Sequence, residues 1–219
     1  MKTKRKNRPE TIHQAIVWGQ IEWARELISS GQANPAVKDG DGRNALHVAC
    51  QYGYLDLAKQ LIELGIDIES RDVSGLTPIA TACLFDHADV IRFLFEKGGD
   101  INLKDDENDT PLHHACHYGS IKTARLLLSY GADPNVKGSI DDTPLHDACR
   151  KGHAGIVRLL VDRGADLRKR NIHGHTPLDL CTDLPIDDPR REEIIDLFRQ
   201  YAPEMVMERF CTSSHAPEM

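Results

Sequence analysis

The decapeptide TPLHHACHYG at residues 110–119 holds three histidines and one cysteine within five positions, a composition that suggests a metal site. The same pattern returns 33 residues later as TPLHDACRKG (143–152). Further copies in the same register are ETIHQAIVWG (10–19), NALHVACQYG (44–53), TPIATACLFD (77–86) and TPLDLCTDLP (176–185). Six copies indicate a repeat architecture, because a fixed period of tens of residues is typical of solenoids.

Each copy predicts a pair of helices. Threonine followed by proline suits the N-cap and first position of a helix, and a glycine about eight residues later ends that helix in most copies. A second helix follows and stops at another glycine, such as Gly65 or Gly131, where a positive φ is expected. Such a short helix pair cannot bury its apolar faces alone, so neighbouring units must stack.

The pattern D-x-x-G-x-T-P-L-H-x-A followed by G-A-D-x-N resembles the ankyrin repeat family. The segments that carry the resemblance are DVSGLTP, DTPLHHAC, DTPLHDAC, SYGADPNV and DRGADLR. It implies an all-α solenoid of stacked helix-turn-helix units with short hairpin-like connecting loops. The expected repeat domain is 10–202, with units at 10–38, 39–71, 72–104, 105–137, 138–170 and 171–202. Residues 1–9 are expected to form a basic flexible N-terminus, and residues 203–219 a flexible C-terminal tail.

Charge and hydropathy narrow the class of protein. No apolar run reaches the roughly 20 residues that span a bilayer, and no apolar stretch follows the basic N-terminus as in a secretory signal. We therefore expect an intracellular, cytoplasmic or nuclear protein. The basic run at 2–8 is either a nuclear-import signal or a solvated segment. It holds five of the 27 basic residues, so the rest has 22 against 34 acidic residues, which disfavours nucleic acid as a partner.

The repeat also answers the metal question. Cys116 shares its column with Cys50, Cys83 and Cys149, and with Ile16, which indicates a small buried slot. Stacked helices lie about 8–10 Å apart, too far for a disulfide or a shared zinc without distortion. Only Cys211 is expected to be exposed. We predict no metal and no cofactor.

The histidines follow the same column logic. The resemblance implies that the histidine of T-P-L-H hydrogen-bonds neighbouring turns; in this chain the residues concerned are His13, His47, His113 and His146. No phosphate loop, nucleophile elbow or H-E-x-x-H motif occurs, and Asp141 and Asp142 are expected at solvated turn tips. We therefore predict that the chain is not an enzyme.

Function is expected in the columns that the repeat pattern leaves free. In the ankyrin family, the turn tips and the inner face of the first helix line a concave groove. The resemblance places these first-helix residues there: Gln51, Leu84, His114, His117, Arg150 and Lys151. Beside them lies a column of aromatic residues, namely Trp18, Tyr52, Phe85 and Tyr118. The aromatic rings either cover their neighbours at the helix ends or anchor an extended peptide.

Acidic residues lie near the tips of the middle units. They are Asp106, Glu107, Asp109, Asp142 and, just inside a first helix, Asp147. They form either a solvated face or a patch that selects a Lys/Arg-rich segment, with charge setting on-rate and register more than affinity. Asn102 and Asn135 match the hairpin asparagine that asparaginyl hydroxylase modifies in many ankyrin proteins, so both are candidate hydroxylation sites.

Three hypotheses follow for a monomeric, non-enzymatic chain. The first is a scaffold that binds a partner protein or extended peptide in the groove. The second is a nuclear or chromatin adaptor or histone-tail reader, although His114 stands where such readers tend to carry an acid. The third is a stand-alone inhibitor or assembly chaperone, similar in size to gankyrin-like or IκB-like proteins.

Overall fold

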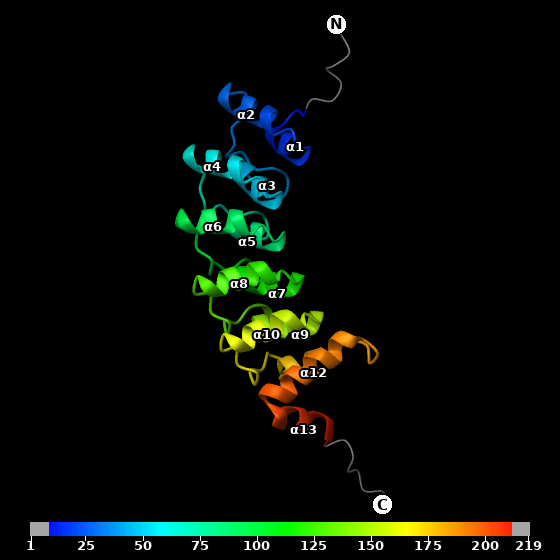
Figure 1. Ribbon diagram of the computed structural model, residues 1–219. Coiled ribbons are helices and arrows are strands. Elements are labelled where there is room, and N and C mark those ends of the chain that lie inside the picture. The colour runs from blue at the N-terminus through cyan, green and yellow to red at the C-terminus, as the bar shows by residue number, and fades with distance from the viewer. Residues whose placement is uncertain (1–8, 212–219) are drawn as a thin grey trace, which may run out of the picture. The chain divides into compact units, whose positions relative to one another are not determined.

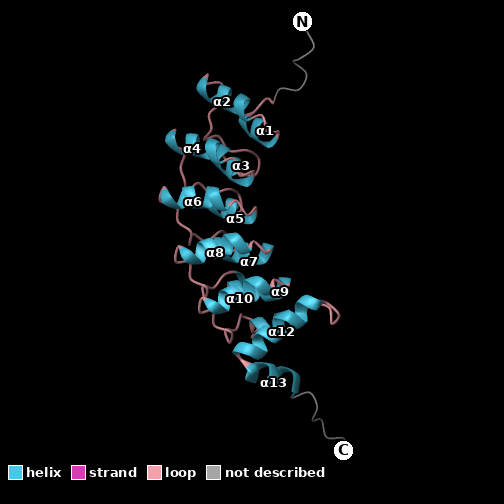
Figure 2. Ribbon diagram, in the orientation of Figure 1, coloured by secondary structure: helices cyan, strands magenta, loops and turns pink. Residues whose placement is uncertain are grey.

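The computed structural model describes residues 9–211 of the 219-residue chain. Within that range every regular element is a helix and no strand is present (Figure 2), which confirms the predicted all-α solenoid. The chain divides into two compact units, Met1–Asp106 and Glu107–Met219. We call them the N-terminal unit and the C-terminal unit and describe each by itself.

The N-terminal unit contains three helix pairs in succession (Figure 1). They are α1 (Ile12–Val17) with α2 (Ile21–Ser29), α3 (Ala45–Gln51) with α4 (Leu55–Glu63), and α5 (Pro78–Leu84) with α6 (Ala88–Glu96). Helix α3 packs against its own partner α4 and against the first helices of both neighbouring pairs. Leu46, Leu57 and Leu94 are almost fully buried in these contacts. The apolar columns of the sequence therefore form a core between successive pairs.

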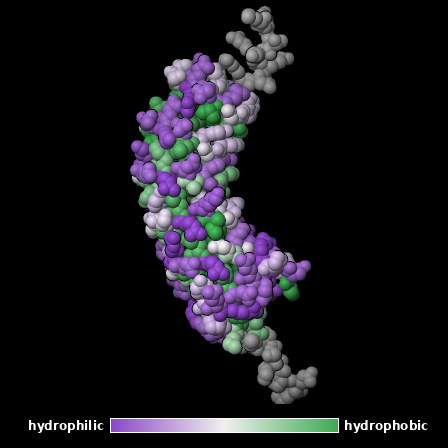
Figure 3. Space-filling view, in the orientation of Figure 1, coloured by the Kyte–Doolittle hydropathy of each residue, from purple (hydrophilic) through white to green (hydrophobic). Residues whose placement is uncertain are grey.

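The C-terminal unit continues the pattern and then departs from it. Its elements are α7 (Pro111–Tyr118), α8 (Ile121–Ser129), the 3-10 turn η1 (Ser139–Asp141), α9 (Pro144–Lys151), α10 (Ala154–Asp162), α11 (Pro177–Cys181), α12 (Pro189–Tyr201) and α13 (Pro203–Cys211). Helix α9 packs against α7, α10 and α11. On the face seen in Figure 3, hydrophilic side chains predominate around α12.

The first helices begin as the sequence predicts. Thr110 and Thr143 are N-caps in extended conformation, with a proline at the first helical position. In each case the histidine three residues later closes a capping box with the backbone of the cap. Since uncapped N–H groups at a helix start need partners, this local chemistry defines where each repeat's first helix begins.

Backbone hydrogen bonds between the tips of successive hairpins link the repeats within each unit. In the N-terminal unit, the N–H of Val73 donates to the carbonyl of Asp41 at 3.0 Å, and that of Asp106 to Ser74 at 3.1 Å. In the C-terminal unit, the N–H of Ile172 donates to Ile140 at 3.0 Å. The hairpins therefore stack in the same register as the helices that follow them.

The end of the described chain differs from the expected flexible tail. Residues 203–211 form α13, which packs against α12, and its Met205 and Val206 are buried. Arg168 pairs with Glu204, and Arg209 pairs with Asp179 at 3.1 Å, so charges also attach this helix to the fifth and sixth repeats. The sequence did not predict this helix, because a nine-residue segment contains too few helical turns to show a clear hydrophobic period. The remainder, 212–219, lies outside the described residues.

None of the helices within residues 9–211 combines the length and the apolar character needed to cross a membrane.

Candidate protein-binding site

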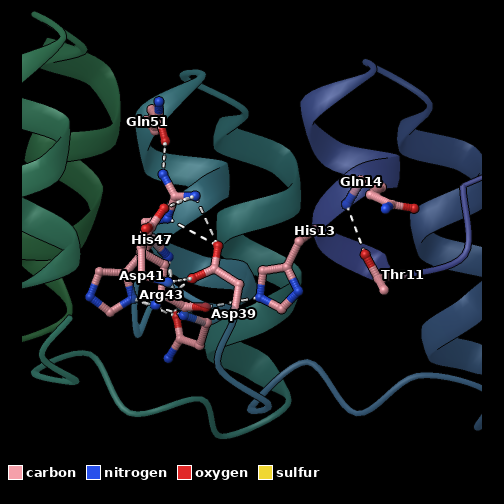
Figure 4. A network of polar contacts seen from close by, with 9 residues as sticks. Thr11, His13, Gln14, Asp39, Asp41, Arg43, His47 and Gln51 are labelled. Atoms are coloured by element: carbon pink, nitrogen blue, oxygen red, sulfur yellow. Dashed lines mark hydrogen bonds and ion pairs between the residues drawn. The ribbon is translucent and has the colours of Figure 1, made fainter. Parts of the chain in front are cut away.

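The histidine column braces the stack, as predicted. His47 Nε2 donates to the carbonyl of Leu76 at 3.1 Å, and His146 Nε2 donates to that of His175 at 3.1 Å. At the N-terminal end His13 does the same with Arg43 at 2.9 Å (Figure 4). Burial lowers the pKa of His47 and of His146. Burial thus favours the neutral form of both rings.

His113 combines a bond to the start of its own helix with a bond to the following hairpin. Its Nδ1 accepts from the backbone N–H of Thr110 at 3.1 Å and from the Thr110 hydroxyl at 2.8 Å, while Nε2 donates to the carbonyl of Asp142 at 3.2 Å. One ring thus caps its own helix and holds the following hairpin. This histidine of the opening decapeptide is occupied by structural hydrogen bonds.

The cysteine column is core, as predicted. The side chains of Cys50, Cys83, Cys116 and Cys149 are fully buried free thiols. Burial raises the pKa of each of these thiols, and that of Cys181 to about 12. A thiol that holds its proton is a poor nucleophile and metal ligand. Among the residues that the structure describes, no group of three or more potential metal ligands comes together; the side chain of Cys211 lies outside them.

The aromatic column is exposed in the N-terminal unit. Trp18, Tyr52 and Phe85 are the C-caps of α1, α3 and α5, and their exposed fractions are 54%, 39% and 48%. Gln51 and Leu84, the residues before the last two, are half-buried. The three rings therefore occupy one register of three successive first helices, and solvent covers a large part of each.

Contacts with the next repeat hold the end of α3 that carries Tyr52. The residue after Tyr52, Gly53, has φ of 69°, and a Cβ there would lie 2.5 Å from Nδ1 of His87. His87 Nε2 donates to the carbonyl of Gln51 at 3.0 Å. Tyr52 also stacks on Tyr54, with ring centroids 6.1 Å apart. The next repeat thus holds the end of α3 that presents Tyr52.

A polar network lies beside these rings in the second repeat. Arg43 bonds the carboxylates of Asp39 at 2.9 Å and Asp41 at 2.8 Å, and its Nη1 donates to Gln51 at 3.2 Å (Figure 4). The arginine holds the pKa of Asp39 low against the opposing effect of burial. Sequence patterns did not single out Arg43, because a charged residue at one variable position carries no signal of its own.

In the C-terminal unit the aromatic column continues with Tyr118, which is 61% exposed. The His117 ring lies against it, with centroids 4.9 Å apart. His114, His117, Arg150 and Lys151 are all half-buried. The C-terminal unit therefore presents one exposed ring of the column beside half-buried histidine, arginine and lysine side chains.

Asp142 is not the solvated tip residue that we expected, and Asp147 is buried as well. Asp142 is 3% exposed; its carboxylate pairs with Arg150 and accepts from Asn171 Nδ2 at 2.8 Å. Asp147 is 7% exposed and lies 3.2 Å from Arg150. Burial, reinforced by Asp109 and Asp142, raises the pKa of Asp147 to about 8. Glu107 and Asp106, the latter in the N-terminal unit, are the exposed members of the predicted set.

Asp109 has a structural role at a hairpin. Its carboxylate accepts from the N–H of Ser139 at 2.7 Å and fills the space beside Gly138, where a Cβ would lie 2.1 Å from Asp109 Oδ1. Gly138 stands at the position of the hairpin aspartates Asp39 and Asp72. The glycine at this position, where these two hairpins have an aspartate, was the sequence signal that Asp109 takes over the role.

The two candidate hydroxylation sites differ in their surroundings. Asn135 bridges to the next hairpin, because its Oδ1 accepts from the N–H of Asp166 at 2.7 Å and its Nδ2 donates to the carbonyl of Gly164 at 2.9 Å. Asn102 is exposed, and its N–H donates to Asp100 at 2.8 Å. Their modification stays a prediction.

Comparison with known families identifies the class. A family of ankyrin repeats in three copies matches residues 1–72 and 69–138, and a family of ankyrin repeats in many copies matches 138–181. The chain belongs to the ankyrin repeat family. Together with the regulatory relatives that follow, this membership indicates a protein-interaction module.

Among curated proteins, the chain is similar to protein phosphatase 1 regulatory subunit 27 of Mus musculus, 36% identical over 67 residues. It is also 40% identical over 55 residues to protein phosphatase 1 regulatory subunit 12A of Homo sapiens, and 32% identical over 60 residues to 26S proteasome non-ATPase regulatory subunit 10 of the same species. These matches cover 31%, 25% and 27% of this chain and 43%, 5% and 26% of the respective relatives. The chain thus matches less than half the length of each relative.

Proposed function

We propose that this protein is a regulatory adaptor that holds an extended segment of a partner protein against the exposed ends of its first helices. The observation that carries the proposal is the shared register of Trp18, Tyr52 and Phe85, all exposed in the N-terminal unit. Large rings give much contact area for little conformational entropy, which is why they are enriched among interface hot spots. The regulatory subunits to which the chain is similar support such a role.

We further propose that the C-terminal unit favours a Lys/Arg-rich part of the same partner. Glu107 presents an exposed carboxylate at the hairpin before α7 in this unit. Exposed negative charge attracts a basic segment and speeds its association. We expect the adaptor to work as a monomer in the cytoplasm or nucleus.

The test uses a peptide chosen by the protein itself. A ligand selected from a random peptide library on the full chain is labelled, and its affinity is measured by fluorescence polarisation. The change Tyr52→Ala/Phe85→Ala should weaken binding at least tenfold, because it removes two anchors. The matched control is Leu64→Ala: Leu64 is 53% exposed at the C-cap of α4, outside the aromatic column.

Leu64→Ala should leave the affinity within twofold, and all variants should keep the wild-type circular dichroism and melting temperature. Equal affinity of the wild type and the double variant would disprove the proposal. Loss of binding in Leu64→Ala alone would place the partner on the second helices instead.

A further inference from the structure

A recess of about 560 Å³ opens beside α1 in the N-terminal unit, at the end of the aromatic column. Its walls come from residues 10–18 and from the segment 32–43. This volume lies in the range of pockets that take a small ligand or a large side chain. The inference drawn from it rests on the proposed function, since it concerns the same bound segment.

One part of the lining is apolar and exposed. Val17, Trp18 and Val37 line the recess, with exposed fractions of 41%, 54% and 55%. Burial of such surface favours binding by about 25 cal/mol per Å² before the costs of association. The indole face of Trp18 can in addition attract a cation. An occupant with an aliphatic stem therefore fits this part.

The polar part of the lining includes several acceptors. Glu10 and Asp39 contribute carboxylates, and the side-chain amides of Gln14, Gln32 and Asn34 also line the recess. Glu10 is exposed, and its carboxylate forms no ion pair within residues 9–210. Within the described residues, such a carboxylate can accept a new cation without losing an existing partner.

The cations at the recess are already engaged. Arg43 bonds two carboxylates, those of Asp39 and Asp41. The Lys38 ammonium donates to the carbonyl of Arg71 at 2.7 Å. Since one guanidinium is shared by two carboxylates, the three groups together carry one negative charge. Asp41 lies outside the lining, so the lining charges of Glu10, Asp39, Lys38 and Arg43 balance. The carboxylate of Glu10 is therefore the charge that a positive occupant can meet.

We propose that this recess receives one arginine or lysine side chain of the bound segment. Its stem lies on Val17, Trp18 and Val37, and its charged head reaches Glu10 and the neighbouring amide oxygens. Long cationic side chains are suited to such a mixed site, because their stems pack on apolar surface while the head keeps polar partners. The recess would thus set the register of a segment whose next residues reach Tyr52 and Phe85.

The test uses the full chain labelled with ¹⁵N. The probe is a capped heptapeptide with a central arginine flanked by leucines, and its matched controls carry lysine, norleucine or glutamate at the centre. Binding is followed by the indole N–H signals in ¹⁵N NMR spectra. The chain has two tryptophans, and Trp23, whose Nε1 donates to the carbonyl of Pro9 at 3.3 Å, is the internal reference.

The arginine and lysine peptides should shift the Trp18 indole signal in a saturable way, and that of Trp23 much less. The norleucine peptide should bind at least fivefold more weakly, and Glu10→Gln should weaken the arginine peptide about fivefold while leaving the norleucine peptide unchanged. Salt should weaken only the cationic peptides. Trp18→Leu should reduce binding of all peptides.

Three results would overturn the proposal. Equal binding of norleucine and arginine, or no effect of Glu10→Gln, would remove the cation preference; if Tyr52→Ala/Phe85→Ala still abolished binding, the proposed function would stand. The third result comes from a variant in which the five basic residues at 2–8 are replaced with serine. In this variant the Trp18 indole signal would shift without peptide, and the arginine peptide would bind more tightly than to the wild type. That result would assign the recess to the chain's own N-terminal residues instead of a partner.

Discussion

Repeat two and repeat five differ at the two positions where the hairpin meets the first helix. In repeat two of the N-terminal unit, Arg43 stands before the first helix and reaches Gln51. In repeat five of the C-terminal unit, the equivalent positions hold Asp142 and Arg150, which form an ion pair. The hairpin residue therefore donates to the first helix in repeat two, whereas it accepts from the first helix in repeat five.

The difference continues into the core. Val48 in repeat two is 1% exposed among apolar neighbours, whereas the equivalent Asp147 in repeat five is 7% exposed and carries a carboxyl group. The hairpins differ too: Asp39 accepts from two N–H groups of its own turn, whereas Gly138 leaves that space to Asp109 of the preceding hairpin. In repeat five, a carboxylate of the preceding repeat thus takes the place of the hairpin's own aspartate, and a buried carboxyl group takes the place of a buried valine.

The largest effect should come from restoring the missing aspartate. Gly138→Asp is expected to lower the free energy of unfolding by about 3 kcal/mol, because its Cβ would meet Asp109 Oδ1 and His113 Nε2 at 2.1 and 2.7 Å. Urea unfolding would measure it. Gly40→Ala is the control in the N-terminal unit, since nothing lies within 4 Å of that Cβ, and it should change stability little.

The double variant Gly138→Asp/Asp109→Gly tests the cause. With the Asp109 carboxylate removed, the new aspartate can accept from its own turn as Asp39 does, so the double variant should be more stable than Gly138→Asp alone. If the effects of the two single changes simply add, the contact between these positions is not the reason for the loss.

A pH-dependent effect should follow for Asp147. The unfolded chain releases this proton near pH 4, but the folded protein keeps it to about pH 8, so the folded state binds more protons in that window. This contribution therefore lowers stability as the pH rises from about 4 to 8. Asp147→Asn, which resembles the protonated form, should be about 2 kcal/mol more stable than the wild type at pH 8.

The same two proteins should be nearly equally stable at pH 4. Urea unfolding at both pH values measures the difference, and Val48→Ala, a loss without a titrating group, should cost the same at each. An Asn variant with the wild-type pH dependence would show that Asp147 is ionised in the folded state at neutral pH.

The smallest expected effect on stability is the difference between removing Arg150 and removing Arg43. Arg150→Gln should cost about 1.5 kcal/mol at pH 7, because it leaves the buried Asp142 without its cation. Arg43→Gln should cost only about 0.5 kcal/mol, since Asp39 and Asp41 are more exposed and stay solvated. Thermal unfolding of the pair measures the contrast; equal costs would mean that burial does not separate the two repeats.

Much of the architecture is local and was predictable. The period, the Thr-Pro helix starts and the terminal glycines are written in neighbouring residues, because capping and turn conformations depend on atoms a few positions apart. The histidine and cysteine columns follow from the period as well. His113 and Cys116 of the opening decapeptide lie where their columns place them, one bridging turns and the other buried.

The candidate site was predictable only in part. The aromatic column could be listed from the sequence, but its exposure depends on how far the next repeat covers each helix end. The acidic patch was misjudged for Asp142 and Asp147, because their burial and pairing involve Asn171 and Arg150 in addition to the turn itself.

The sequence alone therefore determined the family, the helix pairs and the columns, since each of these depends on short-range spacing repeated six times. The tertiary structure decided which variable residues face water, which carboxyl group keeps its proton, and where a recess opens beside α1. These properties depend on desolvation and on charges brought together from positions about 30 residues apart. A one-dimensional pattern of residues contains neither quantity.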